Sequence, residues 1–221
     1  MPEEIKLPNK RLGYYYIKEK QYVAVTTVLE ILNKPALISW AIKETAKAIA
    51  NHPNIITNES DVFSAVYGTR NKAGERGKTI HSFLEILKRG NPLPITPKEY
   101  QGYVQALQSW WNTHNPEILE LEKLVYSNKF GYAGTTDLIA NINKEIWVID
   151  IKTGKAIYPE HKLQISAYRQ CLIEMDKKVD KFGVVLLKED SNFEFIESEN
   201  CLEAFLHAKA LFEWKNKYIS N

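Results

Sequence analysis

The sequence has little of several features that mark particular classes of protein. It holds only two cysteines, without the spacing of a metal site, which predicts reduced side chains in a cytosolic protein rather than a disulfide framework. It has no apolar run of the roughly 18 residues that a membrane-spanning helix needs, and its first residues, MPEEIKLPNK, lack the apolar segment of a secretory signal. A net charge of only +2 gives no general attraction for nucleic acid, so any basic surface has to be local.

The composition is otherwise that of an ordinary globular protein. Hydrophobic residues make up 44% and charged residues 25% of the 221 positions. That is enough chain for one substantial α/β domain, or for a core with a helical subdomain. The pattern of elements changes near residue 116, which predicts an N-terminal hairpin and helical region at 1–116 that lines a cleft, and a core at 117–221.

The first region is predicted to be mostly helical. Its expected elements are a hairpin at 14–25, a short helix opened by the capping-box pair Thr27 and Glu30, helices at 35–51 and 71–88 with a mixed segment at 53–70 between them, and a helix with Thr96 as its N-cap residue and Pro97 at its first position.

The second region is predicted to alternate between strands and helices. Its expected elements are strands at 118–127, 131–141 and 145–152, a helix at 160–176, strands at 182–188 and 193–197, and a last helix that ends near 218. This order predicts an α/β (α+β) fold with a central mixed β-sheet flanked by helices.

Two neighbouring strands of this core carry carboxylates in their apolar runs. If the polar pair Asn143–Lys144 is the turn of a symmetric hairpin, Asp137 lies directly opposite Asp150. Facing side chains have Cβ atoms about 5 Å apart, and two carboxylates that close repel each other unless a cation lies between them. Lys152 projects from the same face as Asp150 because side chains alternate along a strand. We therefore expect a divalent metal site here; the alternative is an exposed sheet face with ordinary surface charges.

His81, in the predicted helix at 71–88, is a candidate imidazole ligand if it meets these carboxylates. Glu85 lies one turn after it and Lys78 one turn before it. Arg76 and Lys78 belong to a basic segment that either contacts phosphates or forms a solvated helix face. The run Gly77-Lys78-Thr79 lacks the earlier glycine of a phosphate-binding loop, so we expect no nucleotide cofactor.

Three further residues are candidates for supporting such a site. Gln164 and Tyr168 lie one turn apart on the helix that follows the second strand, where an amide can bond to a phosphate or a neighbour and a tyrosine can stack or pack. Glu122, on the strand before the hairpin, either faces the same site or lies on the surface. For the helix pair the alternative is an amphipathic helix with Tyr168 partly in the core.

These residues in this order resemble the PD-(D/E)XK nuclease superfamily and its RecB-like exonuclease branch, which includes phage and viral exonucleases and the mitochondrial genome maintenance exonuclease. The matching pieces are His81, Gly134-x-x-Asp137, Asp150-x-Lys152 and Gln164-x-x-x-Tyr168, and the likeness extends from about residue 22 to 188. Thr136 stands where the superfamily has proline. The resemblance implies a restriction-endonuclease-like core and a cytoplasmic protein of the kind that phages and viruses encode.

The resemblance also implies a role for each residue. Asp137, Asp150, His81 and the backbone carbonyl of Ile151 would hold Mg²⁺ or Mn²⁺, and Lys152 would activate or position the attacking water. Gln164 and Tyr168 would support the site and DNA, with Glu122, Glu85, Arg76 and Lys78 as supporting or DNA-binding residues. An iron–sulfur cluster needs four cysteines and is excluded by the count of two.

The function that follows from the resemblance is a metal-dependent DNA exonuclease. It would hydrolyse phosphodiester bonds on single strands or DNA ends in replication, recombination or repair. Its expected partner is DNA, and no association with a membrane is expected. The alternatives are an endonuclease of restriction or repair type on the same core, and a DNA-binding protein without catalysis. Polarity, DNA against RNA, and oligomeric state stay open at this point.

Overall fold

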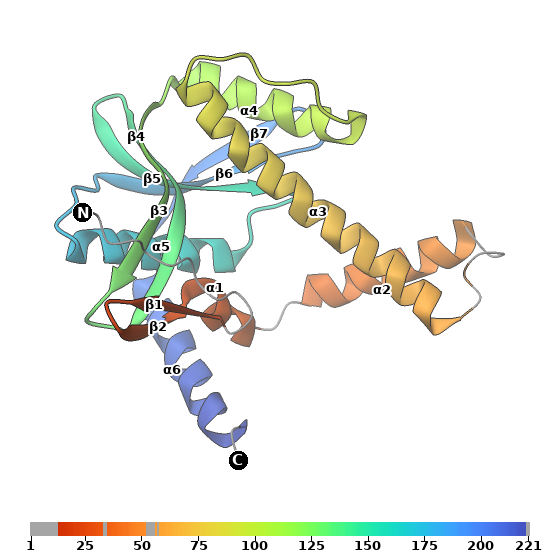
Figure 1. Cartoon of the computed structure of the whole chain (residues 1–221), viewed down its shortest axis with the longest axis horizontal. Coiled ribbons are helices and arrows are strands. Elements are labelled where there is room, and N and C mark those ends of the chain that lie inside the picture. The colour runs from red at the N-terminus through yellow and green to blue at the C-terminus, as the bar shows by residue number, and fades with distance from the viewer. Residues whose placement is uncertain (1–12, 33–34, 52–55, 57, 220–221) are drawn as a thin grey trace.

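The computed structural model describes residues 13–32, 35–51, 56 and 58–219 (Figure 1). Its helices are α1 (Val25–Val28), α2 (Pro35–Asn51), α3 (Glu59–Lys88), α4 (Gln101–His114), α5 (Pro159–Glu174) and α6 (Leu202–Ile219). Its strands are β1 (Tyr14–Ile17), β2 (Lys20–Ala24), β3 (Glu117–Ser127), β4 (Tyr132–Ile142), β5 (Glu145–Thr153), β6 (Lys181–Leu187) and β7 (Phe193–Glu197). None of the described helices is long and apolar enough to cross a membrane.

The seven strands form one mixed sheet. The strand order is β1-β2-β4-β5-β6-β7, and β3 pairs with β4 off this path. The pairs β2–β4 and β5–β6 are parallel and the other pairs are antiparallel. Helices pack on both faces, so the predicted fold, a central mixed β-sheet flanked by helices, is confirmed.

Each face of the sheet has its own core, because the side chains of a strand alternate between faces. On one face α1, α5 and α6 pack against Val148 and its neighbours, with Ile165 and Phe205 fully buried among them. On the other face α3 and α4 pack against Ile149, with Trp110 fully buried. The alternation predicted for the second strand of the hairpin is therefore confirmed.

The strands β2 and β5 share one edge of β4. β2 pairs with its beginning, at Tyr132 and Ala133, whereas β5 pairs with its end from Leu138 onward. β3 occupies the opposite edge along most of the strand. Residues 134–137 of β4 therefore lie between two neighbours on the shared edge, and the sheet opens beside Asp137.

The helix α3 is much longer than predicted. It begins at Glu59 instead of residue 71, so residues 59–70 of the segment predicted to be mixed are helical, whereas 53–55 and 57 lie outside the described residues. The start is fixed by a capping box: the Asn58 side chain accepts a hydrogen bond from the Asp61 backbone N–H at 3.1 Å, and the Asp61 carboxylate accepts one from the Asn58 backbone N–H at 3.3 Å. Glycines at 68, 74 and 77 weakened the helical pattern without ending the helix.

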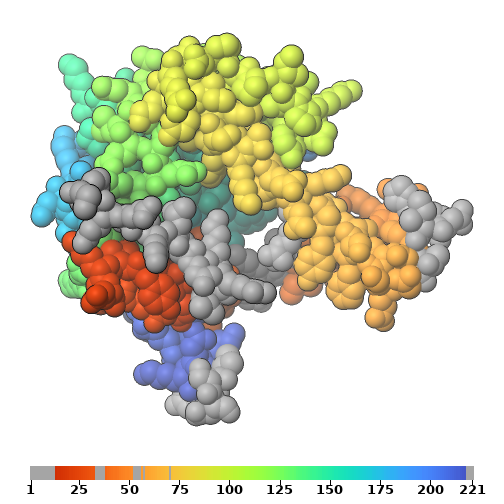
Figure 2. Space-filling model, in the orientation of Figure 1, coloured from red at the N-terminus to blue at the C-terminus, as the bar shows by residue number. Residues whose placement is uncertain are grey.

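Figure 2 shows that α2 and the beginning of α3 project from the body.

Two predicted helix starts are wrong. α1 begins at Val25, with Ala24 as its N-cap residue, so Thr27 lies inside the helix and caps nothing. Before α4, Pro97 stays in an extended conformation (φ −50°, ψ 146°), and a 3₁₀ turn begins only at Lys98. A proline that keeps an extended ψ cannot serve as the first residue of a helix, which displaces the start past Thr96.

Candidate active site

The hairpin of β4 and β5 has the predicted turn and register. Asn143 and Lys144 both have positive φ, 54° and 69°, as a two-residue hairpin turn of type I′ requires. The strands pair up to Leu138 opposite Ile149, the register that the symmetric turn predicted. One step further along, Asp137 and Asp150 follow at the point where this ladder ends.

Asp150 is a buried carboxylate with a cation beside it. Its residue is only 1% exposed, and the Lys152 ammonium donates a hydrogen bond to Oδ1 at 3.0 Å and lies 2.9 Å from Oδ2. That second contact is an ion pair without hydrogen-bond geometry, so Oδ2 accepts no hydrogen bond within the described residues. Burial raises the pKa of Asp150, while Lys152 opposes the shift.

Lys152 is held in its charged form. Burial by itself would lower the pKa of Lys152, but the carboxylates of Asp150 and Asp137 outweigh it and raise the pKa above its ordinary value. The ammonium also donates to Oε1 of Gln164 at 3.2 Å. A lysine in this state can neutralise negative charge and orient a water or a phosphate oxygen, but it is a poor proton acceptor.

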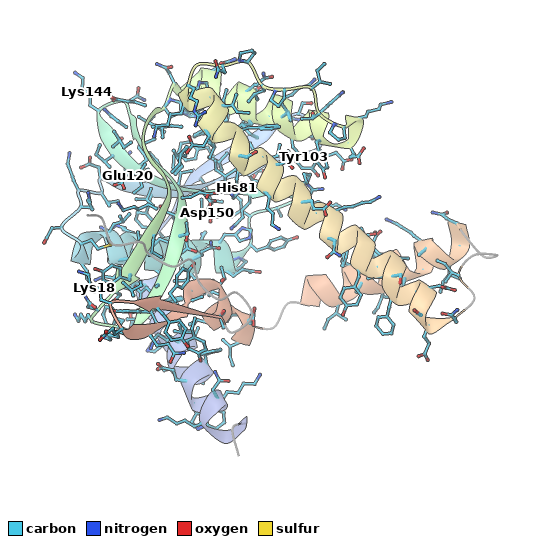
Figure 3. The ribbon with its side chains drawn as sticks, viewed as in Figure 1. Lys18, His81, Tyr103, Glu120, Lys144 and Asp150 are labelled. Carbon is cyan, nitrogen blue, oxygen red and sulfur yellow. The ribbon has the colours of Figure 1, made fainter. Side chains whose placement is uncertain are left out.

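His81 reaches the same place from α3. Its Nδ1 lies 3.5 Å from Oδ1 of Asp137, and its Nε2 lies 2.9 Å from the backbone carbonyl oxygen of Ile151. The other oxygen of Asp137 accepts a hydrogen bond from the backbone N–H of Ile151 at 2.7 Å. An imidazole, a carboxylate and a backbone carbonyl therefore converge where β4 and β5 separate. Figure 3 shows His81 on α3 above Asp150, where the central strands cross.

Gln164 and Tyr168 support this arrangement from α5. The Gln164 amide donates to Oδ1 of Asp150 at 3.0 Å and to the Tyr168 hydroxyl at 3.1 Å. Tyr168 is buried beneath β4, where a Cβ on Gly134 would lie 2.3 Å from its ring. The glycine of the Gly134-x-x-Asp137 segment is thus the residue that admits the tyrosine ring.

Glu122 and Glu85 line a hollow of about 240 Å³ beside His81 and Asp137. Glu122 lies opposite Asp137 in the register of β3 and β4, because the pairs on either side of it are Leu121 with Leu138 and Lys123 with Thr136. Its φ of 45° is unusual for a non-glycine residue in a strand. The placement puts a third carboxylate near the two aspartates.

The basic residues of α3 occupy different surroundings. Lys78 is exposed and lines an open hollow of about 370 Å³ that also contains His81, Glu122 and Lys152. Arg76 is fixed instead: its Nε donates to Oγ1 of Thr153 at 3.4 Å, and its guanidinium lies 4.3 Å from the centre of the Tyr103 ring. Lys78 is therefore available to a ligand, whereas Arg76 holds α3 against the end of β5.

Sequence reasoning missed one titratable neighbour of the site. His161, in the first turn of α5, is close enough to Asp150 to act on the pKa of its carboxyl group, which it lowers. Its Nδ1 accepts a hydrogen bond from the backbone N–H of Tyr158 at 3.2 Å. The available signal was its place three residues before Gln164, which puts both side chains on one face of the helix.

The donor atoms suit a hard divalent cation. Carboxylate and carbonyl oxygens with one imidazole are ligands that Mg²⁺ and Mn²⁺ accept, and the buried Oδ2 of Asp150 has no hydrogen bond of its own. Within the described residues, no three histidine, cysteine, aspartate or glutamate side chains are grouped so as to hold a metal ion. Lys152 stands beside Asp150 and supplies the positive charge that the carboxylate needs. The site thus fits the ion by its chemistry, with Asp150 engaged by lysine.

No family model matches the sequence, and no curated protein matches it. Solved structures of similar fold include the protein SSO0001, with 16% identity over 93% of this chain and 80% of that chain, at a TM-score of 0.43. They also include the alkaline exonuclease LHK-Exo from Laribacter hongkongensis, with 14% identity over 67% of this chain and 84% of that chain, at a TM-score of 0.37. LHK-Exo in complex with dAMP has 15% identity over 65% and 82%, at a TM-score of 0.36.

Proposed function

We propose that this protein is a divalent-metal-dependent nuclease that hydrolyses phosphodiester bonds of DNA. The observation that carries the proposal is the meeting of Asp137, Asp150 and Lys152 with His81 where the central hairpin opens. A buried carboxylate is costly unless it binds a cation. A fold that buries Asp150 beside the partly exposed Asp137, at an opening in the sheet, therefore has a use for the pair.

Asp137, Asp150, His81 and the carbonyl of Ile151 are the proposed ligands of Mg²⁺ or Mn²⁺. A bound divalent ion supplies charge stabilisation at the phosphate and a lowered pKa for a coordinated water. Lys152, whose raised pKa keeps it charged, then serves to orient the water and to stabilise negative charge on the phosphate. Accepting the proton of the water is not its role in this proposal.

Gln164 and Tyr168 are proposed as positioning residues. The Gln164 amide bonds to both members of the Asp150–Lys152 pair and is itself held by the Tyr168 hydroxyl. This chain of bonds fixes the Asp150 carboxylate, so a change of Gln164 moves the catalytic group without removing it.

Within this class we propose an exonuclease, acting on single strands or DNA ends in replication, recombination or repair. Linear and circular DNA, single- and double-stranded and labelled along its length, would be incubated with Mg²⁺, Mn²⁺ or EDTA. An exonuclease degrades linear substrates and leaves circles intact, an endonuclease cuts both, and a protein without catalysis binds DNA and degrades neither. Only metal-dependent loss of linear DNA with intact circles supports the full proposal.

The site is tested by Asp150→Asn, with Asp176→Asn as the matched control. Asp176 is an exposed aspartate in the turn after α5, and its φ of 56° suits asparagine. We expect Asp150→Asn to lower cleavage by more than about 100-fold while DNA binding in EDTA persists, and the control to cleave like the wild type. Unchanged cleavage by Asp150→Asn would show that the chemistry lies elsewhere.

A further inference from the structure

One face of α3 leads from the candidate site to the projecting part of the molecule. His81 and Phe63 lie on the same face, since about 18 residues separate them and an α-helix repeats every 3.6 residues. Tyr67 lies within about 40° of that face, at about 100° per residue. At 1.5 Å per residue the two aromatic residues are about 20–27 Å from His81.

The aromatic residues at the far end are exposed as a pair. Phe63 is 60% and Tyr67 is 52% exposed. Their rings lie 6.2 Å apart with an angle of 29° between their planes, a stacked arrangement. Two large, exposed rings on the same helix offer a surface on which another ring can stack. A helix that contacts only water has no need of such apolar side chains.

The helix face between the aromatic pair and the site is open at Gly74 and Gly77. A Cβ on Gly74 would meet no atom within 4 Å, and one on Gly77 would meet only Oγ1 of Thr153, at 3.9 Å. Both glycines line the same hollow as His81, with exposed Lys78 next to them. Glycine costs about 1 kcal/mol relative to alanine inside a helix, so two of them on this face leave room beside the site at the expense of helix stability.

We infer that this face of α3 binds single-stranded nucleic acid, with bases stacked on Phe63 and Tyr67 while the end of the strand lies at His81. The inference rests on the proposed nuclease function and narrows its substrate from single strands or DNA ends to single strands. Unpaired bases have free faces for aromatic side chains, and each stacked base contributes about 1–3 kcal/mol. Lys78 supplies a positive charge along the path. The bases of a duplex are stacked on one another and cannot use the aromatic pair.

Binding is measured with Phe63→Ala/Tyr67→Ala and with the control Ile38→Ala/Ile42→Ala. The control removes exposed apolar side chains of α2, 61% and 65% exposed, from the same projecting part without removing a ring. The probes are fluorescent single strands of about 20 and about 3 nucleotides. The shorter strand cannot reach from His81 to the aromatic pair, even when its nucleotides are spaced more widely than the roughly 3.4 Å of a duplex strand. Fluorescence anisotropy in EDTA separates binding from cleavage.

We expect the aromatic double variant to bind the long single strand at least about 10-fold more weakly, one stacked base being lost. Its affinity for the short strand and for a blunt duplex, and its cleavage of the short strand with Mn²⁺, should equal those of the wild type. Phe63→Trp should bind the long strand as tightly as the wild type or more tightly.

Three results would overturn the inference: unchanged affinity for the long strand, equal losses for strand and duplex, or an equal loss in the α2 control. Self-association of the wild type that the aromatic variant abolishes, seen by sedimentation, would assign the face to a second copy of the chain instead. If the wild type binds the long strand through the aromatic pair yet cleaves nothing, the proposed function fails and the binding surface stands. If the wild type cleaves DNA and the aromatic variant binds the long strand as tightly as the wild type does, the proposed function stands and the binding surface fails.

Discussion

Glu122 has a backbone conformation that its residue type rarely adopts. Its φ is 45°, within a strand and opposite Asp137, and it lines both hollows next to His81. A positive φ costs an ordinary L-residue about 1–2 kcal/mol, and such costs persist where the surroundings or the function require them. We interpret the strained glutamate as part of the candidate site.

Replacing Glu122 with asparagine should separate stability from activity. Asparagine tolerates positive φ, so the free energy of unfolding in urea should stay equal or rise by up to about 1 kcal/mol. Cleavage should fall by at least about 10-fold if the carboxylate acts on the ion or on Lys152. Glu122→Gln keeps the strain and loses the charge, so it should lose activity without gaining stability. A destabilised Glu122→Asn with full activity would contradict this interpretation.

Gly134 is constrained by a side chain. Because a Cβ there would lie 2.3 Å from the Tyr168 ring, Gly134→Ala forces the ring to move and should cost about 1–3 kcal/mol of unfolding free energy, as overpacked cores do. The displaced Tyr168 no longer holds Gln164, so kcat should fall more than the affinity for DNA. The control is Gly154→Ala, whose Cβ would make an ordinary contact with Leu186 at 3.9 Å. Equal effects of both changes on kcat would contradict the role of Tyr168 in holding Gln164.

At the scale of elements, the hairpin turn between β4 and β5 fixes the register that aligns the two aspartates. Both of its central residues have positive φ, and asparagine followed by glycine is the pair best suited to such a turn. Lys144→Gly should therefore raise the free energy of unfolding by about 0.5 kcal/mol, the relief of strain exceeding the greater freedom of the unfolded chain. Lys144→Ala removes the side chain without the relief and should not stabilise. Urea titrations of the three proteins decide between these outcomes.

The same hairpin shows what the sequence can predict. Turn residues and alternation are local, so the facing positions of Asp137 and Asp150 follow from spacing. The contacts of His81 with Ile151 and of Gln164 with Asp150 span distant parts of the chain, and only tertiary packing creates them. The sequence offered residue types at these positions, and the resemblance offered their roles.

Helices were predicted less well than strands, for a physical reason. The long α3 contains three glycines and no continuous apolar stripe in its projecting half, because that half has little core to face. Periodicity reports burial, so an exposed helix gives a weak signal. The central strands β4, β5 and β6 are buried on both faces and carry clear apolar runs.

His114, the last residue of α4, gives the packing of this helix on β7 a pH dependence. Its ring packs against Phe193 and Phe195, and burial lowers its pKa below the ordinary value of 6.5. The unfolded chain therefore takes up a proton at higher pH than the folded one, so stability is fully present above the unfolded pKa and is lost as pH falls toward the folded pKa. His114→Phe should unfold with a smaller loss of free energy between about pH 7 and pH 5 than the wild type. Parallel slopes for the two proteins would show that His114 does not contribute.

The whole molecule joins its two predicted regions through the sheet. β2, from the region 1–116, pairs with β4 of the region 117–221 and carries β1 at its other edge. The helices α3 and α4 of the first region share a core with β4, β5 and β6 of the second. Neither region by itself contains the whole sheet and the helices that cover both of its faces. We therefore expect 1–116 and 117–221 to unfold together, apart from α2 and the projecting half of α3, whose exposed apolar residues lie outside both cores.

Hydrogen exchange and calorimetry test this expectation together. Amides in α2 and in the first four turns of α3 should exchange through openings of low free energy, whereas those in β4, β5 and α4 should exchange only with global unfolding. The calorimetric and van't Hoff enthalpies of the main transition should agree, as they do when a core unfolds in one step. Two resolved transitions, with α4 protected separately from β4, would instead show that the regions are independent domains. In that case His81 would reach the aspartates across a domain boundary, and cleavage should disappear at the lower of the two transitions.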